Sequence, residues 1–258
     1  IKDWNLAQLK SKREKDGAAP QTIKHNFQLI RNAVKWADDH GYLTRELKFP
    51  KIKLTKHRLR YLSESEEVRL LHQLDPKRVR PHRPDYDYRP ESENRMYQDN
   101  YDLVVLLLDT GARYGEIANI KWDSIDLENY VIQLWRPKVR NESIVYMTSR
   151  VKAILERRYN NRVSDDFVFT NKKGQQRGYQ SKGIRKAIKD AGIKDFRIHD
   201  LRHTCASRLV QSGLSLYEVA NILGHTDIST TQIYAHLENK DISQKARNAL
   251  EAYQTKQE

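Results

Sequence analysis

The most chemically unusual stretch of the chain is LGHTDISTTQIYAH, residues 223–236, in which His225 and Tyr234 stand nine residues apart in a polar segment. A phenol acts as a nucleophile when a neighbouring group helps to remove its proton. A tyrosine that closes a helix against a hydrophobic core is the simpler interpretation of Tyr234 taken alone. The choice between the two depends on which other reactive side chains the chain carries.

Two basic residues occur where the local apolar pattern does not explain them. Arg113 lies in TGARYGEI, residues 110–117, where flanking glycines let backbone amides approach a ligand and a guanidinium can bind phosphate oxygens bidentately. Lys138 lies at the bend of a predicted hairpin in WRPKVRN. Taken singly, a capping or ion-paired arginine and a solvated hairpin lysine are the ordinary interpretations.

A third segment, HDLRHT, places His199 and Arg202 three residues apart, so the two share one face of a helix and can donate to one anion. Taken alone this pair is ambiguous, because His203 or the carboxylate of Asp200 is an ordinary partner for either side chain.

Considered together, two arginines, two histidines, a lysine and a tyrosine suit nucleophilic attack on a phosphodiester. Phosphoryl transfer needs positive donors around the non-bridging oxygens, a nucleophile in line and an acid for the leaving oxygen. These side chains supply every function without a metal, and the chain has no acidic cluster suited to two Mg²⁺ ions. We therefore predict a phosphodiester-cleaving site that uses no metal and no other cofactor.

The order and context of these residues resemble the catalytic domain of the tyrosine recombinase (phage integrase) family over roughly residues 59–236. The matching motifs are TGARYGEI, HDLRHT, LGH and STTQIYAH, with the hairpin lysine between the first two. The resemblance implies a site-specific recombinase or integrase that cleaves and rejoins DNA through a 3′-phosphotyrosyl intermediate, without metal or ATP.

The resemblance also implies a role for each matching side chain. Tyr234 would be the nucleophile, and Arg113 and Arg202 would hold the non-bridging oxygens. Lys138 would protonate the leaving 5′-oxygen. His199 would assist the deprotonation of Tyr234 or orient the phosphate, and His225 would donate to a phosphate oxygen. Glu116 would position the arginines.

Sequence periodicity predicts a mainly α-helical protein with a small antiparallel β-sheet (α+β). The period changes to two between residues 122 and 147, which predicts the sheet. Ser63 and Glu66 form a capping box that begins a helix. Residues 75–99 contain four prolines and predict a long loop, and residues 101–109 predict a buried helix. Further helical patterns cover 4–15, 21–39, 180–191, 200–212, 216–223, 229–236 and 241–253.

Four parts follow from these patterns. Residues 1–50 resemble the later helices of the family's DNA-clasping core-binding domain, and residues 61–237 form the catalytic domain. Residues 51–60 are a basic linker, as expected of a segment that lies along phosphates; a solvated connector is the alternative. Its candidate DNA contacts are Lys51, Lys53, Lys56, Arg58 and Arg60. Residues 238–258 form a helical tail that we expect to be exchanged between protomers.

Bulk composition limits the partners. The formal net charge is +13, from 47 Lys and Arg against 34 Asp and Glu, so the surface favours a polyanion such as duplex DNA. The longest apolar cluster, residues 103–108, is far too short to cross a membrane. The single cysteine, Cys205, fits a reducing compartment. We expect a cytoplasmic, DNA-associated fragment, because the chain begins with Ile and has no signal-like segment.

The expected partner is double-stranded DNA. We expect four copies of the protein to assemble on paired DNA sites and the protein to be a monomer in the absence of DNA. Accessory DNA-bending and directionality factors are expected by resemblance only. Two alternatives stay open: a type IB topoisomerase, which uses a tyrosine and basic residues to nick and reseal one duplex, and a non-catalytic DNA-binding protein with helix-turn-helix-like elements.

Overall fold

The structure is a computed structural model. It describes residues 2–42, 46–54, 59–79, 90–136, 141–238 and 247. The chain divides into two compact units, Ile1–Arg58 and Leu59–Glu258, and the boundary falls inside the predicted linker. No helix in the described ranges combines the length and the apolar character needed to cross a membrane.

The first unit is a pair of helices, α1 (Asp3–Lys15) and α2 (Pro20–Asp39), which agree with the predicted helices to within a residue. Pro20 occupies the first turn of α2, where its missing N–H is not needed. The apolar face of α2 buries Ile23 and Phe27. Leu6 of α1 is also buried. The unit therefore has a small core of its own.

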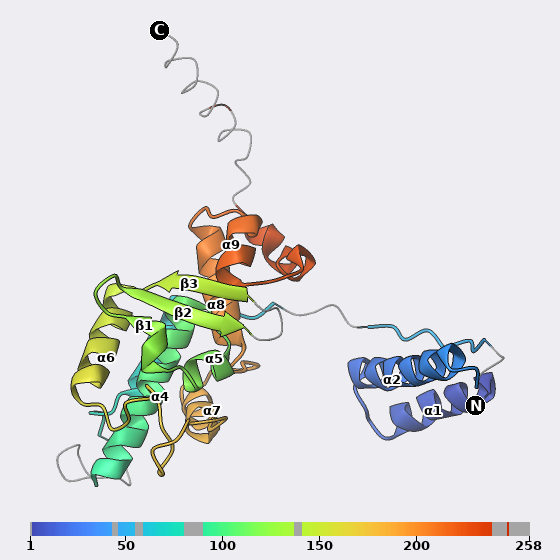
Figure 1. The fold of residues 1–258 in the computed structure, drawn as a ribbon, viewed down its shortest axis with the longest axis horizontal. Helices are drawn as coiled ribbons and strands as arrows, with labels where there is room; N and C mark the ends of the chain where they lie inside the picture. Colours follow the sequence, from blue (N-terminus) through green and yellow to red (C-terminus); the bar gives the residue numbers. More distant parts are fainter. Residues whose placement is uncertain are drawn as a thin grey trace. The chain divides into compact units, whose positions relative to one another are not determined.

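The second unit is built around α4 (Glu91–Thr110), which contacts most of the other helices (Figure 1). Its α-helices are, besides α4, α3 (Glu64–Leu74), α5 (Tyr114–Ala118), α6 (Ser149–Asn160), α7 (Lys182–Asp190), α8 (Asp200–Gln211) and α9 (Leu216–Leu223). The predicted capping box is present at α3: the Ser63 hydroxyl accepts from the Glu66 backbone N–H, and the Glu66 carboxylate accepts from the Ser63 N–H.

The predicted small sheet is confirmed. Strands β1 (Ile125–Asp126), β2 (Val131–Arg136) and β3 (Asn141–Tyr146) are antiparallel, in the order β1-β2-β3 (Figure 1). Ile132 lies opposite Val145, and both are buried, whereas Ile144 and Tyr146 are exposed. This alternation is what a sheet with one covered face requires. The whole is a mainly helical fold with a small sheet, as the sequence predicts.

The predicted loop over residues 75–99 is too long, because α4 already begins at Glu91. The buried part of the helix, predicted over 101–109, is correct: residues 103–108 are almost completely inaccessible. The additional helical turns, ESENRMYQDN, carry no apolar stripe, which explains why periodicity did not detect them. Residues 80–89 lie outside the described ranges.

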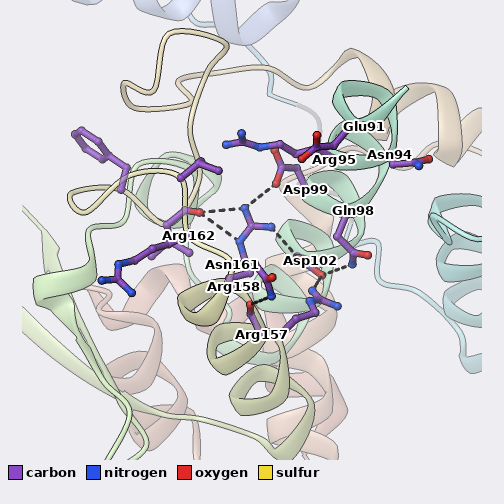
Figure 2. A pocket seen from close by; sticks show the side chains of 13 residues that line it. Glu91, Asn94, Arg95, Gln98, Asp99, Asp102, Arg157, Arg158, Asn161 and Arg162 are labelled. Atoms are coloured by element: carbon purple, nitrogen blue, oxygen red, sulfur yellow. Dashed lines mark hydrogen bonds and ion pairs between the residues drawn. The ribbon is translucent and has the colours of Figure 1, made fainter. Parts of the chain in front are cut away.

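Ion pairs with α6 hold α4 at Asp99, within these additional turns, and at Asp102, just beyond them (Figure 2). Asp102 is completely buried and accepts from Arg157 Nη2 at 2.5 Å and from Arg158 Nη1 at 2.8 Å. Asp99 accepts from Arg158 Nη2 at 2.6 Å. A buried carboxylate is tolerated only when it is paired and hydrogen-bonded, so these arginines of α6 hold the polar turns against the domain. They border a cavity of about 630 Å³.

Gly111 ends α4 in the left-handed conformation, with φ of 61°. A Cβ atom at this position would lie 2.7 Å from Leu223 Cδ2 and 3.1 Å from Cys205 Sγ. The glycine therefore does two things: it allows the left-handed turn, and it lets the end of α4 approach α8 and α9 closely.

We expect Gly111→Ala to lower the free energy of unfolding by more than Gly192→Ala does. Both glycines have positive φ, 61° and 67°, but a Cβ at Gly192 has no neighbour within 4 Å. The left-handed conformation costs a non-glycine residue roughly 1–2 kcal/mol in both variants. Overpacking against Leu223 and Cys205 adds about 1–3 kcal/mol in Gly111→Ala only. Urea denaturation measures the difference; equal losses would contradict the close approach.

The segment predicted as one helix over 229–236 forms two short 3₁₀ helices instead, η3 (Ile228–Thr230) and η4 (Gln232–Leu237). Asp227 begins η3, and its side chain accepts from the Ser229 N–H at 2.8 Å. The prediction is therefore wrong in helix type; 3₁₀ turns are frequent in connecting segments such as this one. Of the helix predicted over 241–253, the structure describes residue 247 alone, and that residue is helical.

Candidate active site

Arg202 lies in the first turn of α8 and is almost completely buried, with 3% of its surface exposed. Its Nη1 donates to the Gly111 carbonyl at 2.7 Å and its Nη2 donates to the Leu223 carbonyl at 2.8 Å. These carbonyls belong to the C-terminal ends of α4 and α9, which carry partial negative charge. The two helix ends therefore offset the cost of burying the guanidinium.

This pair of hydrogen bonds brings two predicted site residues toward α8. Arg113 follows Gly111 by two positions, and His225 follows Leu223 by two positions. Arg202 binds a carbonyl two residues before Arg113 and another two residues before His225. It therefore fixes the loop that carries each of these residues to the start of α8. Segments far apart in the sequence thereby meet at one place.

Arg113 is held by Glu116. As the N-cap of α5, Arg113 donates its backbone N–H to Glu116 Oε2 at 2.8 Å, and its Nη1 donates to Glu116 Oε1 at 2.8 Å. The Arg113 side chain remains 46% exposed, whereas that of Glu116 is 13% exposed. One carboxylate thus orients the guanidinium while leaving it open to solvent.

His225 is oriented by Thr231. The Nδ1 atom of His225 lies 2.7 Å from the Thr231 hydroxyl, and Thr231 is completely buried. The Thr231 carbonyl also accepts from the Tyr234 backbone N–H at 3.0 Å. The orientation of His225 is therefore coupled to the 3₁₀ turn that carries Tyr234.

Tyr234 is buried in a small apolar cluster between α8 and α9, and only 1% of it is exposed. Burial disfavours the phenolate and raises the pKa of Tyr234 to about 12, although the nearby charge of Arg202 opposes this increase. In this conformation the hydroxyl is a weak nucleophile at neutral pH. Attack on a phosphate requires a proton acceptor and access to the hydroxyl oxygen.

The side chain that contacts the Tyr234 hydroxyl is His203. Its Nδ1 lies 2.6 Å from Tyr234 Oη, and the two ring centroids are 5.8 Å apart. In the sequence, His203 is only an ordinary neighbour of Arg202. The signal that could have identified it is its position four residues after His199, since residues at this spacing share one face of a helix.

His199 is the N-cap residue of α8. Its ring lies edge-on to that of His203, and the two ring centroids are 5.2 Å apart. Desolvation by the surrounding protein lowers the pKa of His199, and the charges of Arg202 and Arg113 lower it further, while Asp200 opposes them. His199 is therefore neutral at pH 7.

A second cavity, of about 430 Å³, lies beside His199. Its lining includes the aromatic rings of Tyr179 and Phe196 and the guanidinium-bearing residues Arg185 and Arg197. Arg185 and Arg197 are exposed, so positive charge borders the site on the α7 side. A surface of this kind attracts a phosphate backbone.

Some residues that the sequence predicts to contact DNA or to act in catalysis lie away from this site or outside the described ranges. Lys138, Lys56 and Arg58 are not among the described residues. Lys51 and Lys53 are exposed, as a phosphate contact requires. Arg60 belongs to the second unit, where its Nη2 pairs with Glu66 Oε1 at 2.5 Å and lowers the pKa of that carboxyl. Arg60 therefore has a structural contact at the start of α3.

The Phage integrase family sequence pattern matches residues 60–241, which is more than half of the chain. This chain belongs to the phage integrase family. The family relationship predicted from the four motifs is thereby confirmed.

Individual relatives in the phage integrase family are tyrosine recombinases and integrases. Tyrosine recombinase XerA of Saccharolobus solfataricus is 33% identical over 156 residues, which cover 60% of this chain and 51% of the relative. The integrase of Salmonella phage P22 is 32% identical over 158 residues, which cover 56% of this chain and 41% of the relative. The chain thus spans about half the length of the curated relatives that it matches.

Solved structures of similar fold include two DNA complexes. The XerH site-specific recombinase bound to a palindromic difH substrate has a TM-score of 0.74 and 21% identity, with 95% of this chain and 72% of that chain covered. The Tn1549 transposon integrase in complex with a circular intermediate DNA has a TM-score of 0.72 and 18% identity, with 98% and 85% covered. At these identities the likeness establishes the fold.

Proposed function

We propose that this chain is a site-specific DNA recombinase that cleaves and rejoins DNA through Tyr234. The observation that carries the proposal is the position of Arg202, whose two backbone hydrogen bonds draw the Arg113 and His225 loops to α8, beside Tyr234. A core tyrosine in a simple DNA-binding protein has no need of this convergence of cationic and titratable groups.

In the proposed reaction, Tyr234 Oη attacks the scissile phosphorus. The Oη–P bond forms as the P–O5′ bond breaks, which leaves a 3′-phosphotyrosyl link and a 5′-hydroxyl. The phosphoester bond to the protein retains the free energy of the bond that was cleaved, so a 5′-hydroxyl from a partner duplex reverses the step without ATP. No atom is lost between the two half-reactions.

The other side chains stabilise charge and orient the phosphate. Arg113 and Arg202 bind the non-bridging oxygens and offset the charge of the pentacoordinate transition state. His225 donates to a phosphate oxygen, and the buried Thr231 keeps its ring in one orientation. Glu116 positions Arg113, which the paired 2.8 Å contacts support. His199, neutral at pH 7, orients the phosphate beside both arginines.

Duplex DNA is the proposed partner, and paired sites are held by four protomers. The net charge of +13 and the exposed arginines beside His199 support binding to a polyanion. Residues 1–50 serve as part of a DNA-clasping domain, with Lys51, Lys53, Lys56 and Arg58 on phosphates. The tail over 238–258 docks on a neighbouring protomer. The protein acts in the cytoplasm of a bacterial or phage-infected cell.

A covalent trap tests the proposal. DNA from the flanks of the parent element is prepared as nicked duplexes, so that a short strand diffuses away after cleavage and the protein stays attached. We expect a denaturation-resistant protein–DNA adduct at Tyr234, with a free 5′-hydroxyl and equal yield in EDTA. A strict Mg²⁺ requirement, or no adduct, would reject this mechanism. Efficient relaxation of plain supercoiled DNA would indicate a type IB topoisomerase instead.

The proposed acid, Lys138, makes a separate prediction. Lys138→Ala should slow cleavage of ordinary DNA by about 10²–10⁴-fold, the usual range for a lost proton donor. A substrate with sulfur at the 5′-bridging position should restore the rate, because a thiolate leaves without protonation. Single-turnover cleavage of both substrates measures this, with Lys121→Ala as the matched lysine control. A defect that persists on the sulfur substrate would remove Lys138 from the role.

A further inference from the structure

The proton of Tyr234 must go to a nearby acceptor when the hydroxyl attacks, and the structure brings one side chain into direct contact with it. His203 Nδ1 lies 2.6 Å from Tyr234 Oη. This separation is within hydrogen-bonding range and needs no intervening water. His203 is only partly buried, so its imidazole can exchange protons with solvent between reaction steps.

Helical geometry explains why His203 reaches the nucleophile. It stands in the first turns of α8, directly after Arg202, and Tyr234 comes from η4, which packs against α8. The ring of His199, one turn earlier, lies edge-on to His203 with an interplanar angle of 85°. His203 therefore lies between the residue expected to orient the phosphate and the attacking phenol.

We propose that His203 is the general base that takes the proton of Tyr234 during strand cleavage and returns it during rejoining. This inference rests on the proposed function. The neutral imidazole, with its own proton on Nε2, accepts the phenolic proton at Nδ1 as the Oη–P bond forms and the P–O5′ bond breaks. The leaving oxygen takes its proton from Lys138. In rejoining, imidazolium returns the proton to Oη as that oxygen leaves phosphorus.

Other titratable groups near the phenol are less suited to this step. Cys205 is a buried thiol whose pKa burial raises to about 12, so it is not a proton acceptor at neutral pH. The Nδ1 of His225 is engaged with Thr231 at 2.7 Å. The Asp200 carboxylate accepts from the Arg197 backbone N–H at 2.7 Å. Burial of Tyr234, which raises its pKa, makes such a base necessary.

The test compares two substitutions that separate proton transfer from positioning. In His203→Asn, the amide oxygen lies close to the place of Nδ1 and keeps a hydrogen bond to the hydroxyl, but it cannot hold the proton. His203→Ala removes both functions. Single-turnover cleavage of the nicked duplex is measured for the full chain, with thermal melting and DNA binding as checks on folding. His236→Asn, an exposed histidine of η4, is the matched control.

We expect both His203 variants to cleave about 10²–10⁴-fold more slowly than the wild type, as for loss of a general base. Added imidazole should restore part of the rate of His203→Ala, and His236→Asn should cleave normally. Near-normal cleavage by His203→Asn would overturn the proposal and leave a positioning role. Faster cleavage by His203→Ala would also overturn it, because His203 would then restrain the hydroxyl.

A second measurement combines His203→Ala with a change in the acidity of the nucleophile. Replacing Tyr234 with 3,5-difluorotyrosine gives a more acidic phenol that depends less on a base. The defect caused by His203→Ala should therefore be smaller in the fluorinated protein, and an unchanged defect would overturn the proposal. Absence of any adduct with the wild type would instead reject the proposed function itself, so the two failures are distinguishable.

Discussion

Tyr234→Phe should abolish the covalent protein–DNA adduct while leaving DNA binding nearly intact. The substitution removes the only atom that can form the phosphotyrosyl bond, so the loss should be complete rather than partial. Phenylalanine still fills the apolar cluster in which Tyr234 is buried. Denaturing gels of the trapped adduct, together with binding to the same duplex, measure both effects.

The same substitution has a limited effect on folding. It deletes the hydrogen bond between Tyr234 Oη and His203 Nδ1, and a bond of this kind contributes about 0.5–1.5 kcal/mol. Tyr217→Phe is the matched control, because Tyr217 on α9 is 65% exposed. An adduct that persists in Tyr234→Phe would show that another residue is the nucleophile.

Arg202→Lys should reduce the rate of strand cleavage by about 10²–10³-fold, the usual result of removing one donor to a transition-state oxyanion. Lysine keeps the positive charge, so the variant isolates the geometry of the guanidinium. An ammonium cannot reproduce the planar fork that reaches the Gly111 and Leu223 carbonyls together. Single-turnover cleavage at saturating protein measures the loss.

Arg202→Lys should also destabilise the second unit, since a buried carbonyl left without a donor costs about 1–3 kcal/mol. Arg208→Lys, on the same helix, is the matched control: Arg208 Nη2 pairs with Glu67 Oε2 at 2.5 Å and is partly exposed. Its effect on cleavage should be small. Cleavage by Arg202→Lys at the wild-type rate, at a temperature where the variant is folded, would contradict the assignment.

Helix ends and buried apolar helices were predictable because their causes are local. The Ser63 and Glu66 capping box, the buried run at 103–108 and the alternation of the sheet each depend on neighbours in the sequence. The first turns of α4 were not predictable in this way. The last of these turns carries Asp99, which is paired with Arg158 of α6, 59 residues later in the sequence.

In the candidate site, too, some features follow from the local sequence and others depend on contacts between distant segments. Residue types and order in the four motifs were sufficient to indicate phosphodiester chemistry and the family, because the reaction requires those functional groups whatever their coordinates. The sequence does not distinguish His203, because a histidine after an arginine has many ordinary explanations. Its contact with Tyr234 spans 31 residues, and no local rule predicts a contact of that kind.

The sequence by itself determined the functional groups that the chain can offer and the helices and strands that present them. Tertiary structure alone decided which atoms meet: Arg202 binds carbonyls 91 residues before it and 21 after it, and His203 contacts Tyr234. The physical reason is packing. The left-handed turn at Gly111 lets α4 approach α8 and α9 closely, and only that approach places the buried guanidinium between two helix ends.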